Sequence, residues 1–348
     1  MAEHRKIKVL VVDDSTLMRN MVGDIIKATP EFELVGTAKN GVEAIEQIAK
    51  LSPDVITMDI EMPKMNGLQA LARLMTESPV PTVMLSAHTK EGAESTLLAL
   101  ELGAIDFVTK PSGSISLDID KVRKELVEKI KIAAEVDLGK MQYAKTHYSD
   151  TIPPGEKVSS GIMKTLAIGS STGGTRALSE VLPKLPQNIN ATILLVQHMP
   201  VGFTKSLAER LDNRSKIKIK EAEDGDRLVK GQALLAPAGY HMELASSGDK
   251  VVLNQNPTKF GVRPSVDVMM ESIAMNASNE LIGVILTGMG HDGAKGIASI
   301  KKRGGHTIAE DSSTCVVYGM PRAAVETGAV DEILPLGRIP EAILRSCT

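Results

Sequence analysis

Short apolar runs alternate with amphipathic segments along most of this 348-residue chain. In the first part of the chain the apolar runs are Lys8–Val12, Glu33–Ala38, Val55–Met58, Thr82–Leu85 and Ala104–Val108. Each run has the length of a strand, and the segments between them carry apolar residues at helical spacing. This alternation predicts an α/β domain over residues 7–136, in which helices cover a five-stranded parallel sheet.

The same alternation resumes at Thr165 and predicts a second α/β domain over residues 165–348. Its expected buried strands are Thr165–Ile168, Ile193–Val196 and Leu281–Leu286. Residues 233–253 contain short apolar runs separated by turn residues, which predicts a hairpin. The second domain is therefore expected to be doubly wound and mostly parallel, with one antiparallel hairpin.

Residues 137–164 interrupt the pattern. They contain the breaker-rich stretches Asp150–Glu156 and Ser159–Gly161, which have little to bury and predict a linker. The preceding helix, expected at Asp118–Glu135, has an apolar stripe that serves either as core of the first domain or as a contact between domains.

Composition and charge narrow the class of protein. The chain is 43% hydrophobic and 24% charged, as in soluble globular proteins. Residues 1–164 hold 20 basic and 24 acidic side chains, and residues 165–348 hold 20 and 19. Neither half has the basic excess of a nucleic-acid surface, which argues against nucleic-acid partners and a DNA-binding output domain.

Two further features concern location. No apolar stretch approaches the roughly 18 residues of a membrane span, and the N-terminus lacks an apolar leader, so no membrane insertion is expected. Cys315 and Cys347 are isolated thiols without paired spacing, which suits a reducing compartment. The sequence predicts a cytoplasmic protein.

Polar side chains gather where the strands of the first domain end. Asp13 and Asp14 follow the first run, Asp59 the third, Ser86 the fourth and Lys110 the fifth. A single aspartate at such a point is commonly a helix N-cap or turn residue. Because ligands bind beyond the carboxyl ends of parallel strands, the joint placement favours a site. Converging carboxylates favour Mg²⁺, and the lysine and hydroxyl could hold a phosphoryl group beside it.

This set resembles the receiver domain of two-component response regulators, which has a flavodoxin-like fold, over residues 7–130. The resemblance implies that Asp59 is the phosphoacceptor. It also implies that Asp13 and Asp14, together with Asp59, hold Mg²⁺, while Ser86 and Lys110 engage the phosphoryl group.

Phe107 lies where receivers place a switch aromatic. The alternative is an ordinary core residue of the last strand, and the sequence leaves both interpretations open.

The second domain carries a G-x-S-x-G pattern directly after its first strand. Ser171 is central in Gly169–Gly174, and a helical pattern follows over Thr175–Leu185. A sharp strand-to-helix turn of small residues exposes the serine hydroxyl, as in serine hydrolases. Ser170 is a rival nucleophile. A dinucleotide-type phosphate loop is another interpretation, although G-x-G-x-x-G is not matched.

A serine nucleophile needs a base, and the base needs a carboxylate to orient it. His198 follows its strand as Ser171 does, and Asp292 lies in a glycine-rich loop after a third strand. Each has a plainer interpretation: His198 as a buried or capping histidine, and Asp292 as the N-cap of a helix at Gly293–Lys302. His291 is a rival base.

Four motifs together resemble the chemotaxis protein-glutamate methylesterase family, whose architecture is a receiver followed by this catalytic domain. They are Gly169-Ser-Ser-Thr-Gly-Gly-Thr175, Gln197-His-Met-Pro200, Arg263-Pro-Ser-Val-Asp267 and Leu286-Thr-Gly-Met-Gly-His-Asp-Gly-Ala294. The resemblance implies that Ser171 is the nucleophile, His198 the base and Asp292 its orienter. Met289 and Gly290 become candidate oxyanion donors. Ser170 departs from the family, which more often has Ala there.

The resemblance also implies a function. Glutamate methyl esters of chemoreceptors would be hydrolysed and selected receptor glutamines deamidated, under control of phosphorylation by the chemotaxis histidine kinase. Mg²⁺ is expected for receiver phosphorylation and no cofactor for hydrolysis. The alternative from another class is a response regulator whose second half is a binding or scaffolding module with a structural Ser171.

Overall fold

The computed structural model describes residues 5–111, 117–139 and 163–347. The chain divides into two compact units, Met1–Leu138 and Gly139–Thr348, here called the N-terminal and C-terminal units. Most of the predicted linker, including Asp150–Glu156 and Ser159–Gly161, lies outside the described residues.

The N-terminal unit contains a five-stranded parallel sheet in the order β2-β1-β3-β4-β5. Its strands are β1 (Ile7–Val12), β2 (Phe32–Ala38), β3 (Val55–Asp59), β4 (Thr82–Ser86) and β5 (Asp106–Thr109). Every residue of β3 and β4 is buried, which explains their continuous apolar runs. The parallel five-stranded sheet predicted from the sequence is confirmed.

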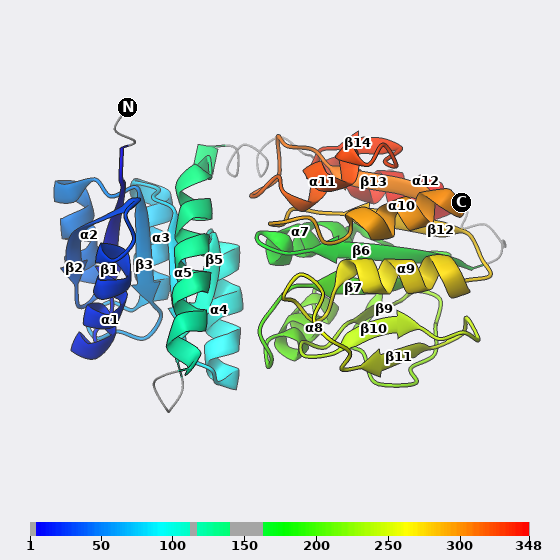
Figure 1. Cartoon of the computed structure of the whole chain (residues 1–348), viewed down its shortest axis with the longest axis horizontal. Helices are drawn as coiled ribbons and strands as arrows, with labels where there is room; N and C mark the ends of the chain where they lie inside the picture. Colours follow the sequence, from blue (N-terminus) through cyan, green and yellow to red (C-terminus); the bar gives the residue numbers. More distant parts are fainter. Residues whose placement is uncertain (1–4, 112–116, 140–162, 348) are drawn as a thin grey trace. The chain divides into compact units, whose positions relative to one another are not determined.

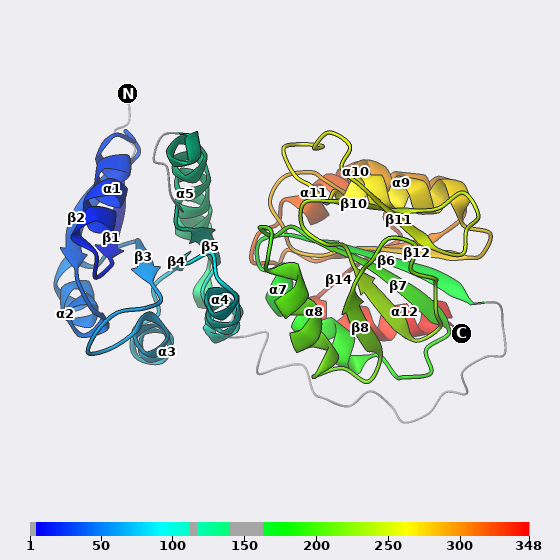
Figure 2. The same ribbon diagram turned by 90° about the horizontal axis from the view of Figure 1, so that it is seen from below.

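Helices cover both faces of this sheet, with α1 and α5 on one face and α2, α3 and α4 on the other (Figure 2). They are α1 (Thr16–Lys27), α2 (Gly41–Leu51), α3 (Gly67–Glu77), α4 (Lys90–Leu102) and α5 (Leu117–Glu135). Side chains of Ser15, Asn40, Asn66 and Thr89 accept a main-chain N–H in the first turn of α1 to α4. These caps supply acceptors for donors that a helix leaves unpaired at its start.

The apolar stripe of α5 is core. Its Leu126, Ile130 and Ala133 are fully buried, and the helix packs against β3, β4 and β5. The structure thus favours the core interpretation for these residues.

The C-terminal unit is built on a seven-stranded sheet in the order β14-β13-β12-β6-β7-β9-β8, with parallel pairing throughout (Figure 1). The central strands are β6 (Lys164–Ser170), β7 (Ala191–Gln197) and β12 (Leu281–Ile285), and the outer ones are β8 (Lys218–Glu221), β9 (Gln232–Leu235), β13 (His306–Glu310) and β14 (Glu332–Leu334). From β6 the chain first runs toward β7 and later returns to β12 on the other side. Ligand sites in doubly wound sheets form at such a reversal.

Helices flank this sheet on both faces, as the prediction of a doubly wound domain requires (Figure 2). One face carries α9 (Val266–Asn276), α10 (Ala294–Lys302) and α11 (Met320–Glu326), and the other carries α7 (Gly174–Val181), α8 (Thr204–Asp212) and α12 (Ile339–Cys347). Short 3₁₀ turns occupy Leu182–Lys184 and Leu336–Arg338.

The predicted hairpin is confirmed as β10 (His241–Leu244) paired antiparallel with β11 (Val251–Asn254). It forms a separate two-stranded sheet, whereas β9 joins the main sheet in parallel.

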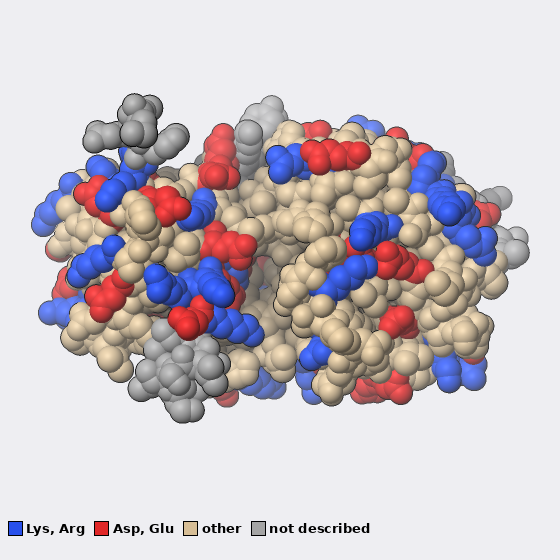
Figure 3. Space-filling view, in the orientation of Figure 1, with Lys and Arg blue, Asp and Glu red and all other residues tan. Residues whose placement is uncertain are grey.

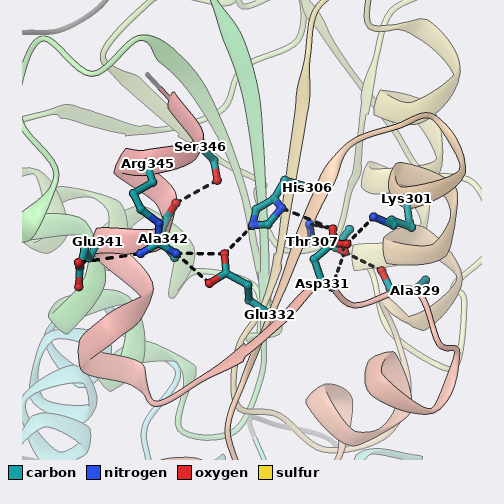
Figure 4. A network of polar contacts seen from close by, with 10 residues as sticks. All are labelled: Lys301, His306, Thr307, Ala329, Asp331, Glu332, Glu341, Ala342, Arg345 and Ser346. Atoms are coloured by element: carbon teal, nitrogen blue, oxygen red, sulfur yellow. Dashed lines mark hydrogen bonds and ion pairs between the residues drawn. The ribbon is translucent and has the colours of Figure 1, made fainter.

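A polar network ties the C-terminal helix to the edge of the main sheet (Figure 4). His306, at the start of β13, lies 2.8 Å from Glu332 of β14, and Arg345 of α12 donates to the same carboxylate at 2.8 Å. Lys301 and His306 pair in turn with Asp331. The network sits at the amino end of β13, away from the carboxyl ends where the candidate site forms.

Surface charge is mixed. On the face drawn in Figure 3, basic and acidic side chains are interspersed over each unit. Among the described residues, no helix is both long and apolar enough to cross a membrane. Cys315 and Cys347 are free thiols.

Candidate active site

Three neighbouring strands of the C-terminal unit end at one place. Ser171 directly follows β6 and His198 directly follows β7, and Ser170 and Gln197 are register partners at the ends of these strands. Thr287 lies just beyond β12, on the other side of β6. Main-chain hydrogen bonds join the three exits: Ser171 N–H donates to the Thr287 carbonyl at 3.0 Å, and His198 N–H to the Ser170 carbonyl at 3.1 Å.

The serine lies on the sharp turn that its glycines predict. Gly174 N–H, the first of α7, donates to the Ser171 carbonyl at 2.7 Å. Gly173 has a φ of +79°, a conformation that favours glycine. A Cβ at Gly174 would come within 2.1 Å of Gln197 Oε1 and 2.7 Å of Ser170 Cβ, so a larger residue here would displace the Gln197 amide. The turn leaves the Ser171 side chain partly exposed.

Ser170 has a different environment. It is fully buried, and its hydroxyl donates to Gln197 Oε1 at 2.7 Å. The arrangement favours Ser171 over Ser170 as the accessible hydroxyl.

Gln197 is a site residue that the sequence analysis did not single out. Its Nε2 donates to the carbonyls of Ser171 and His198, at 2.9 and 3.0 Å. The buried amide of Gln197 therefore links the turn that carries Ser171 to the turn that carries His198 through hydrogen bonds. The signal was present in the Gln197-His-Met-Pro200 motif, but a buried glutamine at a strand end has no distinctive spacing of its own.

His198 and Asp292 are brought together. The distance between His198 Nε2 and Asp292 Oδ2 is 2.9 Å, and both side chains are largely shielded from solvent. Because Asp292 takes Nε2, Nδ1 is the ring nitrogen left for a proton from an alcohol. Within the described part of the chain, Ser171 Oγ forms no hydrogen bond with His198. Such catalytic bonds often tighten only when substrate is present.

Asp292 is held by more than the histidine. Its Oδ1 accepts from Ser265 Oγ at 2.8 Å and from Asp267 N–H at 2.9 Å, while Oδ2 accepts from Val266 N–H at 2.7 Å. Burial by itself raises the pKa of Asp292, but the hydrogen bond and charge of His198 and the donors around it bring that pKa below its usual value. The carboxylate is therefore an anion suited to stabilise a protonated imidazole.

The alternative interpretation of Asp292 as N-cap of the following helix is not what the structure shows. The N-cap of α10 is Gly293, with a φ of +99° and no side-chain cap. The Asp292 carboxylate turns instead to the start of α9.

Met289 and Gly290 lie on the loop that leads from β12 to Asp292. Gly288 N–H of the same loop is taken by the Val317 carbonyl. Among the described residues, no hydrogen bond uses the main-chain N–H of Met289 or of Gly290. Exposed His291 instead stacks edge-on against Phe260, with ring centroids 4.3 Å apart, and is not the partner of Asp292.

The acidic cluster of the N-terminal unit is also assembled. Ligand oxygens of Asp13, Asp14 and Asp59 lie within 4.8 Å of one another. Lys110 Nζ is 2.8 Å from Asp13 and 2.8 Å from Asp59. Burial raises the pKa of Asp59 to about 6, with Lys110 opposing and Asp13 adding to the rise. Three carboxylate oxygens this close fit a hard divalent cation such as Mg²⁺, which would relieve their repulsion.

Arg19 was missed by the sequence analysis. Its guanidinium donates to the carbonyls of Asp13 and Asp14, each at 2.8 Å, and so fixes the acidic turn.

The sequence analysis grouped Ser86 and Phe107 with this cluster. In the structure, both side chains have contacts with other residues. Ser86 is fully buried, 2.5 Å from the Thr96 hydroxyl of α4. Phe107 is buried in β5, with Lys129 Nζ 5.1 Å from its ring centre. The Ser86 hydroxyl therefore has a partner on α4.

A flavodoxin-like unit with an acidic cluster, joined to a doubly wound unit with a serine turn beside a His–Asp pair, is typical of response regulators whose output unit is an enzyme. The family model for the CheB methylesterase matches residues 166–343, and that for the response regulator receiver domain matches residues 9–119. The chain belongs to the CheB methylesterase family and carries a receiver domain, as its sequence motifs predicted.

Individual relatives agree with this assignment. A protein-glutamate methylesterase/protein-glutamine glutaminase of Pyrococcus abyssi is 49% identical over 98% of this chain and 94% of its own length. The protein of that name from Thermotoga maritima is 47% identical, covering 98% of each chain. The crystal structure of the Thermotoga maritima CheB methylesterase catalytic domain covers 52% of this chain and 97% of its own, with 47% identity and a TM-score of 0.51.

Proposed function

We propose that this chain is a phosphorylation-regulated serine hydrolase that removes methyl groups from glutamate methyl esters of chemoreceptors and deamidates receptor glutamines. The observation that carries the proposal is the 2.9 Å contact of His198 with buried Asp292, on the strand exit next to that of Ser171. The names of the full-length relatives supply the substrate bond, a glutamate methyl ester or a glutamine amide.

The geometry suggests the order of proton transfers. Ser171 Oγ attacks the ester carbonyl while His198 Nδ1 takes its proton, because Nε2 is engaged by Asp292. The main-chain N–H groups of Met289 and Gly290 are the proposed donors to the oxyanion. Methanol leaves with the proton from His198, and a water activated by the same nitrogen then releases the glutamate.

Regulation is assigned to the N-terminal unit. Asp59 is the proposed phosphoacceptor, with the chemotaxis histidine kinase as phosphodonor, and Asp13, Asp14 and Asp59 would hold the Mg²⁺ that neutralises charge during transfer. Lys110 would pair with the phosphoryl oxygens, since it already lies 2.8 Å from Asp59. With this substrate and this phosphodonor, the proposed site of action is the cytoplasm.

A fluorophosphonate probe tests the nucleophile and separates an esterase from a binding module. We expect stoichiometric labelling that mass spectrometry maps to Ser171, because Ser171 is partly exposed whereas Ser170 is fully buried. Ser171→Ala should abolish labelling, while acceptance of phosphate at Asp59 continues. Ser170→Ala is the matched control and should still be labelled. A folded wild-type protein that resists the probe, or an adduct on Ser170, would refute this assignment.

A further inference from the structure

The helices α9 and α10 start side by side, and each start is capped by a carboxylate from the other. Asp292 immediately precedes the N-cap of α10 yet accepts the N–H groups of Val266 and Asp267 in the first turn of α9. Asp267 belongs to that first turn, and its Oδ1 accepts Gly293 N–H at 2.9 Å and Gly296 N–H at 2.8 Å, at the start of α10. Both carboxylates are almost completely buried.

The contacts of the two carboxylates come in addition to the N-cap residues of the helices. Ser265 is the N-cap of α9, and its Oγ accepts Val268 N–H at 3.3 Å, so α9 does not need the Asp267 side chain for its own start. The N-cap of α10 is a glycine without a side-chain acceptor. The N-cap of α10 therefore provides no side-chain acceptor, and Asp267 provides it instead, as an anion at the positive end of that helix.

The exchange fixes the residue that orients the histidine. Gly293 follows Asp292 directly, and its N–H is held by Asp267. The main chain next to Asp292 is thus held by Asp267. The Asp292 side chain is held separately, because its carboxylate oxygens accept from Ser265 Oγ and from the main chain of α9. Placement errors of about 1 Å in a catalytic group can cost a factor of about 100 in rate.

We propose that Asp267 is a positioning residue for hydrolysis, acting through Asp292, and that Ser265 shares this role. The proposal rests on the proposed function, since Asp292 must orient His198 for its placement to matter. Asp267 contacts no reacting atom. Its oxygen Oδ1 holds the start of α10, while Oδ2 lies 3.5 Å from Lys259 in an ion pair.

The test measures methanol release from methylated receptor membranes by the full-length chain. Asp267→Ala removes the acceptor for Gly293 and Gly296 and should lower kcat at least about tenfold with KM unchanged. Asp267→Asn keeps the acceptor oxygen for Gly293 and Gly296 and gives up the negative charge, including the 3.5 Å ion pair with Lys259. Because the hydrogen bonds hold the position, it should retain kcat within about threefold. Glu271→Gln, on the same helix as Asp267, is the matched control: it loses the 2.9 Å ion pair with Lys259 and should not change kcat.

A double-mutant cycle separates positioning from general destabilisation. In an Asp292→Asn background, Asp267→Ala should change the residual kcat less than about twofold, because the group it positions is gone. If Asp267→Ala does not fold, Ser265→Ala should lower kcat and Ser265→Thr restore it. The inference is overturned if Asp267→Ala has the wild-type kcat. It is also overturned if Asp267→Ala lowers kcat by the same factor in the wild-type and Asp292→Asn backgrounds. Full activity of Asp292→Asn alone would instead overturn the proposed function.

Discussion

Two buried carboxyl groups of the C-terminal unit show how environment sets charge at the scale of a residue. Asp292 has four donors and a pKa below its usual value, although burial opposes this. Glu310, at the end of β13, is fully buried, and burial raises its pKa to about 7. Its Oε2 accepts Thr287 N–H, and Thr287 in turn accepts the N–H of Ser171. One carboxyl group is thus kept ionised next to His198, and the other holds the main chain of Thr287.

Glu310 should make the stability of the C-terminal unit depend on pH. Its folded pKa of about 7 lies above the ordinary value of 4.5, so the folded state binds the proton more tightly. This contribution is complete below pH 4.5 and is lost as the pH rises through 7, a difference of roughly 3 kcal/mol. Glu310→Gln keeps an acceptor for Thr287 and should remove this part of the pH dependence.

Calorimetric unfolding of the C-terminal unit at pH 5 and pH 8 measures the effect. Glu326→Gln, on an exposed glutamate of α11, is the control and should follow the wild type. Parallel pH curves for wild type and Glu310→Gln would show that Glu310 is not the group responsible.

At the scale of elements, the site depends on the register of β12, β6 and β7. These strands end together, so loops far apart in the sequence meet without long connections. Gln197 completes the junction because it is the last residue of β7 and bonds Ser170, Ser171 and His198. Its amide uses both Oε1 and Nε2, which is typical of a buried polar group that fixes a unique arrangement.

Replacing this amide should loosen both turns. Gln197→Leu leaves the His198 carbonyl and the Ser170 hydroxyl without this partner, at a cost of about 2 kcal/mol. We expect a kcat reduced at least about tenfold, because Ser171 and His198 lose their shared support. Ser170→Ala removes one hydrogen bond of the same cluster and should cost about 1 kcal/mol with a smaller loss of kcat. Equal kcat losses in the two variants would mean that the Gln197 amide does not couple the turns.

The strand exits were predictable because buried parallel strands give continuous apolar runs. Val55–Met58 appears as β3 with one more residue at its end, and Ile193–Val196 forms the centre of the longer β7 (Ala191–Gln197). The strands β8, β13 and β14 were not predicted. For β8 and β14 the reason is that edge strands are short and only partly buried. The strand pattern predicted that Ser171, His198 and Asp292 lie on loops at the strand ends. It did not predict the hydrogen bonds that Gln197 and Asp267 form. Those bonds depend on the approach of elements distant in the sequence.

At the scale of the molecule, the chain joins a phosphate-accepting fold to a hydrolytic one. Each unit has its candidate site at the carboxyl edge of a parallel sheet: Asp13, Asp59 and Lys110 in the first, and the Ser171 turn in the second. In the proposed function, a change of charge at Asp59 regulates hydrolysis at the Ser171 turn.

The most direct test is methanol release from methylated receptor membranes by the full-length chain, with and without a small-molecule phosphodonor and Mg²⁺. The account predicts release by the wild type that increases with phosphodonor, and none by Ser171→Ala under either condition. Methanol release by Ser171→Ala at the wild-type rate would contradict it.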